Sequence, residues 1–394
     1  MNPEPSLLIL CANLVRRKDR RFVMTNTLWE VLGLPVQFLD AVDGEWVPKW
    51  KLARYPADVT PSSYAVRLTK RLALRRFLQS SSHFLLYLED DVVVTEEFDQ
   101  RVQEAMSLGK EVVFLGGGHI LPPLGEGRWQ QSRRTYNNHA LLFSREGARK
   151  CRRVLSQWKQ GWSDSEIQQA TEEGRLEVWC ANPWVAFQRE SQADNWGNFD
   201  CVGIAEAGTP MMLPDDLAVL DAALNISKVV IEYGSGGSTL HVGSRLKDWG
   251  RLVSVEHSRE WYEKVKPELD RLGLPVDYLL REPRPLRSGD GPWRFLPGQL
   301  DDYVEAPAAL VAEGEADLLF IDGRERIRCA LASARLLRPG GLMMIHDFWP
   351  RARYRASLAE LLDPYDFLFD TPGRKGDDPQ GMAVFRKKLA GSLH

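Results

Sequence analysis

The sequence lacks the features that mark several classes of protein. Its five cysteines are scattered and form no Cys-x-x-Cys pair, which argues against a structural zinc site or a secreted disulfide framework. The apolar run Leu7-Leu-Ile-Leu10 is too short for a signal core or a membrane span. A formal net charge of −3 supplies no general basic field for nucleic acid. We therefore expect a cytoplasmic protein with no transmembrane segment and no nucleic-acid partner.

What is present indicates two globular domains of α/β class. The chain has 394 residues, of which 44% are hydrophobic and 27% charged, and this length exceeds what one core usually supports. Strand-like runs alternate with amphipathic stretches such as Ala65 to Leu78 and Arg145 to Trp158. The segment Ser191 to Pro214 is rich in Asn, Asp, Gly and Pro, and we place the boundary near residue 205. The predicted domains are residues 1–204 and 205–394.

Two series of short apolar runs give the expected strands. In the first half they are residues 7–10, 36–38, 84–88, 112–115 and 140–143. In the second half they are residues 229–231, 252–255, 276–280, 318–321 and 342–345. The spacing of the second series predicts a doubly wound parallel sheet of Rossmann-like type.

Three consecutive carboxylates interrupt an apolar run in the first half. Glu89, Asp90 and Asp91 lie within Leu85 to Val94, where like charges at a strand end repel unless a cation or solvent neutralises them. Mg²⁺ or Mn²⁺ would suit such ligands, because these ions take carboxylate oxygens and bridge to phosphates. The alternative is an ordinary acidic turn in solvent.

The acidic triplet is one of four motifs that occur in a particular order. Asn13-Leu-Val-Arg-Arg-Lys-Asp-Arg-Arg21 precedes it, as does Ala41-Val-Asp-Gly44, and Ser144-Arg-Glu-Gly-Ala148 follows it after an aromatic-rich strand. Together these motifs resemble the family-25 glycosyltransferases, the group of lipooligosaccharide and collagen galactosyltransferases. The resemblance spans about the first 200 residues. It implies a GT-A-like fold that transfers a sugar from a nucleotide-sugar donor to a glycan acceptor, with a divalent metal.

The resemblance also implies roles for individual residues near the donor. Asp91 would ligate Mn²⁺ or Mg²⁺, and Glu89 and Asp90 would orient the donor or complete the metal shell. Arg16, Arg17 and Arg20 would contact the diphosphate, because guanidinium groups pair well with phosphate oxygens. Their alternative is a solvated turn after a strand.

Further positions concern the nucleotide and the acceptor. Asp43 and Gly44 would form a tight turn beside the nucleotide, or only a turn. Asp164 is the first choice for the base that takes the acceptor proton, and Glu166 is the second. The alternative for this acidic segment is the capped start of a helix.

One departure from the family pattern bears on activity. The family carries a Ser-His pair in the helix before the acidic strand, whereas this chain has Thr69-Lys70-Arg71 there and Ser82-His83 only next to the strand. The alternative to an active glycosyltransferase is therefore a first domain that binds a glycan without catalysis.

The second half contains a glycine-rich turn between a strand and a helix. Val229-Val-Ile-Glu-Tyr-Gly-Ser-Gly-Gly-Ser-Thr239 allows positive φ and close approach to a ligand, and Glu256 ends the next strand at a spacing used to hold ribose hydroxyls. Pro339-Gly-Gly341 precedes the fifth strand. These elements resemble the class I S-adenosylmethionine-dependent methyltransferases over roughly residues 214–387. A nicotinamide-dependent enzyme would share the geometry of the turn.

The resemblance to methyltransferases assigns the cofactor residues. Gly234, Gly236 and Gly237 would line S-adenosylmethionine, Glu232 would lie near its amino-acid end, and Glu256 would accept from both ribose hydroxyls.

Three residues at the ends of the fourth and fifth strands are the candidates for catalysis. Asp322, His346 and Asp347 face the crevice where open α/β sheets bind ligands. One of them would be the base, or Asp322 and Asp347 would hold a divalent metal, as in some O-methyltransferases. The alternatives are a turn residue at Asp322 and a capped strand end at His346.

The sequence thus predicts a bifunctional transferase of glycan biosynthesis. Its first domain would add a sugar, and its second would methylate a hydroxyl of the same glycan. A lipid-linked acceptor would bring it to a membrane surface as a peripheral protein. The alternatives are a methyltransferase with a non-catalytic glycan-binding domain and a scaffold built from two degenerate domains.

Overall fold

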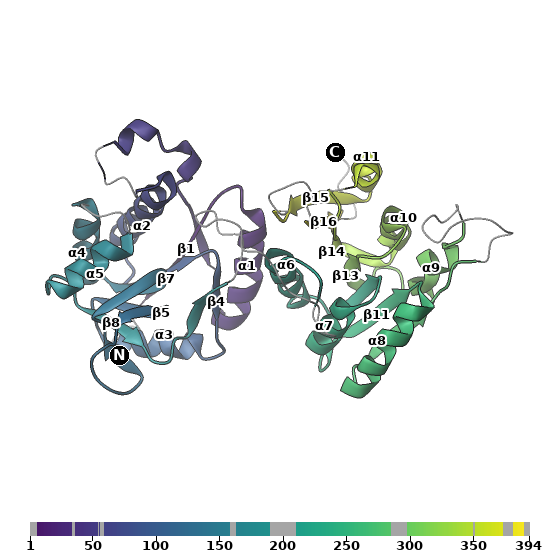
Figure 1. The fold of residues 1–394 in the computed structure, drawn as a ribbon, viewed down its shortest axis with the longest axis horizontal. Helices are drawn as coiled ribbons and strands as arrows, with labels where there is room; N and C mark the ends of the chain where they lie inside the picture. Colours follow the sequence, from purple (N-terminus) through teal and green to yellow (C-terminus); the bar gives the residue numbers. More distant parts are fainter. Residues whose placement is uncertain are drawn as a thin grey trace. The chain divides into compact units, whose positions relative to one another are not determined.

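The computed structural model describes residues 6–33, 36–53, 55, 59–157, 163–189, 210–284, 298–349, 351–372 and 381–389. The chain divides into two compact units, Met1–Gly197 and Asn198–His394, and each is described by itself (Figure 1). The predicted boundary between residues 204 and 205 lies outside the described residues. No helix in the described ranges is long and apolar enough to cross a membrane.

The first unit is built on a mixed sheet in the order β2-β1-β3-β7-β5-β8-β6. Strand β1 pairs in parallel with β2 and β3, whereas β7 is antiparallel to both β3 and β5. A separate antiparallel pair joins β4 to β9. The strands are β1 (Leu7–Asn13), β2 (Gln37–Asp40), β3 (Phe84–Glu89), β4 (Val92–Val94), β5 (Val112–Leu121), β6 (Trp129–Gln131), β7 (Arg134–Ser144), β8 (Val178–Ala181) and β9 (Ala186–Gln188).

Helices cover both faces of this sheet, because successive side chains of a buried strand point to opposite faces. Leu8 and Leu10 of β1 pack in one core with α2, α4 and α5, and Ile9 and Cys11 pack in another with α1 and α3. The helices and short 3-10 turns are α1 (Lys18–Leu32), η1 (Gly44–Trp46), η2 (Lys49–Lys51), α2 (Pro61–Gln79), α3 (Phe98–Ser107), α4 (Arg145–Ser156) and α5 (Ser163–Glu172). The α/β expectation is confirmed in this unit.

The acidic run lies at the end of a strand, as the sequence predicted. Strand β3 ends at Glu89, Asp90 and Asp91 form a turn, and β4 then pairs with β9 instead of continuing the main sheet. Asp90 and Asp91 are nevertheless buried, so the turn holds two carboxylates away from bulk solvent.

The second unit contains a sheet in the order β12-β11-β10-β13-β14-β16-β15. The first five strands in this order are parallel, as predicted, and β16 is antiparallel to both of its neighbours. The strands are β10 (Val229–Tyr233), β11 (Arg251–Glu256), β12 (Val276–Leu280), β13 (Ala316–Ile321), β14 (Leu337–Ile345), β15 (Tyr365–Asp370) and β16 (Ala383–Lys387). The strand order therefore reverses beside β10, which creates a crevice at the carboxyl ends of β10 and β13.

This order bears on the nicotinamide alternative. The usual dinucleotide-binding sheet ends in a sixth parallel strand, whereas here an antiparallel strand is inserted between β14 and β15. The second unit is a Rossmann-like α/β fold with a modified edge. Its helices and 3-10 turns are α6 (Pro214–Leu224), α7 (Gly237–Leu246), α8 (Arg259–Leu272), α9 (Asp301–Glu305), η3 (Ala306–Ala309), α10 (Arg326–Ala332), η4 (Ser333–Arg335), α11 (Ala352–Ala356) and α12 (Leu358–Leu361).

Candidate functional site

The turn after β10 is shaped by glycines. Gly234 has a φ of 86°, and a Cβ added there would lie 2.5 Å from the Cα of Gly323. The turn after β10 is therefore in close contact with the turn after β13, and a side chain at position 234 would separate them. Gly236 is the residue that precedes α7, whose first helical residue is Gly237. The predicted glycines are thus brought together at the crevice.

Glu256 at the end of β11 faces the same turn. Its carboxylate accepts hydrogen bonds from the Ser235 backbone N–H at 2.9 Å and from the Ser235 hydroxyl at 2.8 Å. It also accepts from the backbone N–H groups of His257 at 2.8 Å and Ser258 at 2.7 Å. Burial opposes ionisation, but these hydrogen bonds and the nearby His257 ring outweigh it and lower the pKa of Glu256. The crevice therefore contains an ionised carboxylate beside the glycine turn.

Glu232 is placed differently from Glu256. It is fully buried, and its carboxylate accepts from the hydroxyls of Ser238 at 2.6 Å, Thr239 at 2.7 Å and Ser254 at 2.6 Å. Burial raises the pKa of Glu232 to about 7, despite the three hydroxyl groups. Through these bonds Glu232 links β10 to the first turn of α7 and to β11. It therefore stabilises the two elements that follow and flank the glycine turn.

His346 lies between two carboxylates. Its Nδ1 is 3.1 Å from Oδ1 of Asp322, and its Nε2 is 3.6 Å from Oδ2 of Asp216 in α6. Burial alone would favour the neutral ring, but Asp216 and Asp322 raise the pKa of His346 to about 10. The imidazole is therefore protonated near neutral pH, and it is not a base there.

Asp347 is the third member of this cluster. Its φ of 48° lies in the left-handed region, which is strained for a residue with a side chain, and such strain is found most often at functional sites. Its Oδ1 is buried and has no hydrogen-bond partner among the described residues. One ligand atom each from Asp322, His346 and Asp347 lie within 4.8 Å of one another, a spacing that fits a metal ion. The predicted catalytic residues are thus adjacent in space.

Two further residues of this cluster were not found from the sequence. Arg326 in α10 is buried and donates to the backbone carbonyls of Asp322 at 2.8 Å, Gly323 at 3.0 Å and His346. Asp216 follows Pro214 and Asp215, a sequence that indicates only the first turn of a helix. Asp216 and His346 are 130 positions apart in the chain, and a local sequence pattern does not predict a contact over that separation.

The acidic turn of the first unit is a second polar cluster. Asp90 accepts from Arg20 at 2.7 Å and from the side-chain amide of Asn13 at 2.8 Å, so both of its oxygens have protein partners. Burial raises the pKa of Asp90 despite its contact with Arg20. Asp91 accepts from Gln188 at 3.1 Å through Oδ2, whereas its buried Oδ1 has no hydrogen-bond partner within the described ranges. Asp91 is thus the residue of this pair that has an oxygen available for a ligand.

Glu89 lies beside a buried lysine. Lys70 in α2 is 1% exposed, and its Nζ lies 3.9 Å from Oε1 of Glu89, too far for a hydrogen bond. Burial raises the pKa of Glu89 to about 7, against the effect of Lys70. Lys70 belongs to Thr69-Lys70-Arg71, the segment in which the sequence departs from the family-25 pattern, and its side chain lies beside the acidic cluster.

The candidate bases of the first unit are in α5. Oδ2 of Asp164 accepts weakly from the Asn137 backbone N–H at 3.4 Å, and its charge contributes to the raised pKa of Glu89. Glu166 is buried, with 5% exposure. His139 of β7 is buried against the Ala186 carbonyl, and burial lowers the pKa of its ring. Asp164 is thus the acidic residue of α5 that faces the charged cluster.

The three arginines after β1 have different surroundings. Arg16 is 42% exposed and pairs with Asp43 at 2.9 Å, which also caps η1 through the Glu45 backbone N–H. Arg17 is buried against Asp19 at 2.8 Å, and Arg20 is buried against Asp90. Of the three, Arg16 is the one that solvent reaches readily.

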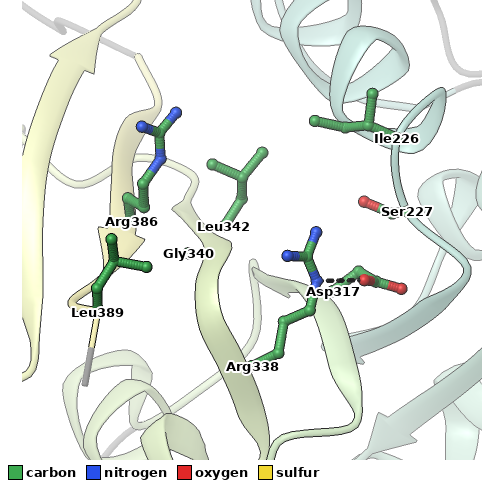
Figure 2. Close-up of a pocket in the computed structure, with 8 residues that line it drawn as sticks. All are labelled: Ile226, Ser227, Asp317, Arg338, Gly340, Leu342, Arg386 and Leu389. Atoms are coloured by element: carbon green, nitrogen blue, oxygen red, sulfur yellow. Dashed lines mark hydrogen bonds and ion pairs between the residues drawn. The ribbon is translucent and has the colours of Figure 1, made fainter.

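A small surface pocket of the second unit lies away from the crevice. Figure 2 shows that it is formed at the amino ends of β13 and β14, where Arg338 pairs with Asp317 at 2.5 Å. Ligands of open α/β sheets bind beyond the carboxyl ends of the strands, so this pocket is separate from the candidate cofactor site.

Comparison with known proteins agrees with the fold of the second unit. Residues 231–348 match the model of a family described as a methyltransferase domain, so the second half of the chain contains such a domain, as predicted. The match includes the glycine turn, Glu256 and the Asp322–His346–Asp347 cluster. It covers none of the first unit, whose resemblance to family-25 glycosyltransferases stays a prediction. No curated protein sequence matches the chain.

Several solved structures are similar to the chain over part of its length. A methyltransferase-like protein from Silicibacter pomeroyi is 20% identical, covers 46% of this chain and 90% of its own, and has a TM-score of 0.35. The O-methyltransferase TomG from Streptomyces achromogenes is 17% identical, with coverages of 43% and 77% and a TM-score of 0.32. An S-adenosylmethionine-dependent O-methyltransferase from Thermotoga maritima is 14% identical, with coverages of 47% and 69% and a TM-score of 0.33.

Proposed function

We propose that the second unit is an S-adenosylmethionine-dependent O-methyltransferase that acts on a hydroxyl of a glycan. The observation that carries this proposal is the ionised Glu256 beside the glycine turn, inside the segment that matches a methyltransferase domain. Gly234, Gly236 and Gly237 would line the cofactor. Glu256 would accept from its ribose hydroxyls by exchanging some of the four hydrogen bonds that its carboxylate now accepts.

The polar cluster at the ends of β13 and β14 would handle the acceptor. Methyl transfer from a sulfonium needs alignment of the acceptor and removal of its proton. Asp347 has a buried oxygen without a partner among the described residues, and we assign it as the base. His346 carries its own proton and would hold Asp322 in position.

A divalent metal is the alternative use of the same carboxylates. The oxygens of Asp322 and Asp347 are ligands that Mg²⁺ and Mn²⁺ prefer, whereas His346 ligates only after losing its proton. A bound metal would lower the pKa of the acceptor hydroxyl. Methyl transfer that persists in excess chelator would support Asp347 as a base, and transfer that stops and returns with Mg²⁺ would support the metal.

The proposal is tested by ligand binding followed by product analysis. Isothermal titration with S-adenosylmethionine should release heat, and titration with NAD should not. Mass spectrometry of a glycan acceptor after incubation with the methyl donor should show added methyl groups. Binding of NAD without binding of S-adenosylhomocysteine would contradict the proposal.

We also propose that the first unit transfers a sugar from a nucleotide-sugar donor with Mn²⁺ or Mg²⁺. The observation that favours this is the buried Oδ1 of Asp91, which has no hydrogen-bond partner among the described residues and lies in the turn after β3 together with Asp90. Asp91 would ligate the metal, which neutralises charge on the leaving diphosphate. Arg16 would contact the phosphates from solvent, while Arg17 and Arg20 would support the loop that carries it.

Asp164 would act as base for the acceptor in this reaction, with Glu166 as the second choice. The D91N variant separates the two proposed activities, because it removes a metal ligand in one unit only. Sugar transfer should vanish while methyl transfer persists. Glycan binding by the unaltered protein without any sugar transfer would instead support a non-catalytic first domain.

A further inference from the structure

Two tryptophans of the first unit project into solvent. Trp46 in η1 is 84% exposed and Trp50 in η2 is 74% exposed, more than the other exposed tryptophans among the described residues. Single exposed apolar side chains are common, but two indole rings on consecutive 3-10 turns expose a large apolar area within one short segment. We name Trp46, Lys49, Trp50 and Lys51 the tryptophan–lysine surface.

The turns that carry these rings are anchored beneath. Val47 is buried in a small core with residues of α2, and Leu52 packs against the same core. The Asp43 side chain caps η1 through the Glu45 backbone N–H at 3.0 Å. The segment thus points Val47 and Leu52 inward and both tryptophans outward, so their exposure is a property of the fold.

The surface is basic as well as aromatic. Lys49 is exposed, and Nζ of Lys51 lies 5.7 Å from the centre of the Trp50 ring. Neither lysine forms an ion pair within the part of the chain that the structure describes, although Glu45 is nearby in sequence. Two lysines that form no ion pair among the described residues therefore flank Trp50, and Trp46 lies on the preceding turn.

The tryptophan–lysine surface follows β2, whose carboxyl end lies on the same side of the sheet as the end of β3 that precedes Asp91. The ion pair between Arg16 and Asp43 ties the loop after β1 to the turn before η1, and Val15 of that loop is 61% exposed. Both loops follow strands that run parallel to β3, which ends beside Asp91. A molecule held on this surface would be near the proposed donor site.

We propose that the tryptophan–lysine surface docks the first unit on a bilayer that contains anionic lipid. Indole rings favour the boundary between headgroups and acyl chains because they have an apolar body and one polar N–H. Lysines beside them attract anionic headgroups while their stems lie along apolar surface. The unpaired lysines favour an anionic bilayer over a neutral sugar as the partner. The inference does not depend on either proposed enzymatic activity.

The test is co-sedimentation of the full-length protein with vesicles. One set contains phosphatidylcholine with phosphatidylglycerol, and the other phosphatidylcholine alone. The protein should bind the anionic vesicles, less as salt is raised, and its tryptophan emission should shift to shorter wavelength. The W46A/W50A variant and the K49Q/K51Q variant should each bind anionic vesicles at least about tenfold more weakly than the unaltered protein does.

Two controls make the result specific. Trp29 in α1 is also exposed, at 55%, and W29A should bind vesicles like the unaltered protein. W46F/W50F should retain much of the binding, and methyl transfer to a soluble acceptor should be unchanged in W46A/W50A. The proposal is overturned if the unaltered protein does not bind anionic vesicles at low salt, or if W46A/W50A binds them equally well. It is also overturned if neutral oligosaccharides change the tryptophan emission and vesicles do not.

Discussion

Nδ1 of His346 lies 3.1 Å from Oδ1 of Asp322, which connects the carboxyl ends of β14 and β13. Asp216 faces the opposite side of the same ring. A histidine held by two carboxylates keeps its proton, so the remaining carboxylate, Asp347, becomes the stronger candidate for proton removal. The sequence offers Asp322, His346 and Asp347 as equivalent candidates for the base, and this arrangement distinguishes among them.

The charge on His346 predicts a pH dependence of stability. Its pKa is raised from 6.5 to about 10 in the folded protein, so its contribution to stability is fully present below pH 6.5 and is lost as pH rises through 10. The free energy of unfolding of the second unit should fall by on the order of 4 kcal/mol between pH 7 and 10. Urea unfolding across this range measures it. H346Q should flatten the curve, and an equally flat curve for the unaltered protein would refute the assignment.

Loss of the Asp347 carboxylate should stop chemistry but not cofactor binding. D347N should reduce the rate of methyl transfer by about 10²- to 10⁴-fold, because it removes either the base or a metal ligand. The dissociation constant for S-adenosylmethionine, measured by titration, should be unchanged. D366N on the exposed part of β15 is the matched control and should be fully active. A D347N variant with normal turnover would exclude Asp347 from catalysis.

Glu256 should act on cofactor affinity. E256Q weakens the proposed bonds to ribose hydroxyls and disturbs the Ser235 turn, so it should raise the dissociation constant for S-adenosylmethionine about 10- to 100-fold. Calorimetric titration measures the change. E268Q is the control, because it removes a pair with Arg271 near the end of α8 that is remote from the glycine turn in sequence. Equal affinity in E256Q and the unaltered protein would count against the cofactor site.

Gly234 should not tolerate a side chain. G234A combines a φ of 86° with a contact of 2.5 Å to Gly323 Cα, so it should cost more than the ordinary 1–2 kcal/mol, about 3 kcal/mol or more. G314A has a similar φ of 73° with nothing within 4 Å, so it isolates the cost of the backbone conformation. Thermal unfolding of both variants gives the difference. Identical melting temperatures of the two variants would mean that the turns after β10 and β13 can move apart without loss of stability.

The arginines after β1 should differ in their effect on stability. R20M leaves Asp90 buried with one partner fewer and should destabilise the first unit by about 3–5 kcal/mol. R16M breaks a partly exposed pair with Asp43 and should cost less than about 1 kcal/mol. Denaturant unfolding measures both. Weaker binding of a nucleoside diphosphate by R16M would support Arg16 as the phosphate contact. Unchanged binding would exclude Arg16 from that role.

The order of elements was largely predictable because it depends on short-range patterns. Each of the ten expected strand segments lies wholly or mostly within an observed strand, since buried strands are continuous apolar runs bounded by polar turns. The short strands β4, β6, β8 and β9 of the first unit and β15 and β16 of the second were not predicted. Tyr365–Asp370 and Ala383–Lys387 mix polar and apolar residues, and their strands form by pairing at the edge of the sheet, β16 with β14 and β15 with β16.

The candidate sites were predictable as positions but not as roles. Carboxyl ends of parallel strands meet at one edge, so sequence alone brings Glu232, Glu256 and Asp322 to the same region. The sequence does not distinguish a carboxylate that faces the crevice from a buried carboxylate that stabilises the elements around it. Glu232 has three hydroxyl partners and is fully buried, whereas Glu256 faces the glycine turn, and only the packing around each separates them.

The sequence by itself determined the α/β class, the apolar strands of the two cores and the glycine turn, because apolar periodicity and the conformational freedom of glycine act over a few residues. Tertiary structure decided the state of the ionisable groups. The proton on His346 depends on Asp216, which is 130 positions away, and the raised pKa of Glu89 depends on burial in the folded unit. Charge and solvation are properties of three-dimensional surroundings, and those surroundings exist only after the chain has folded.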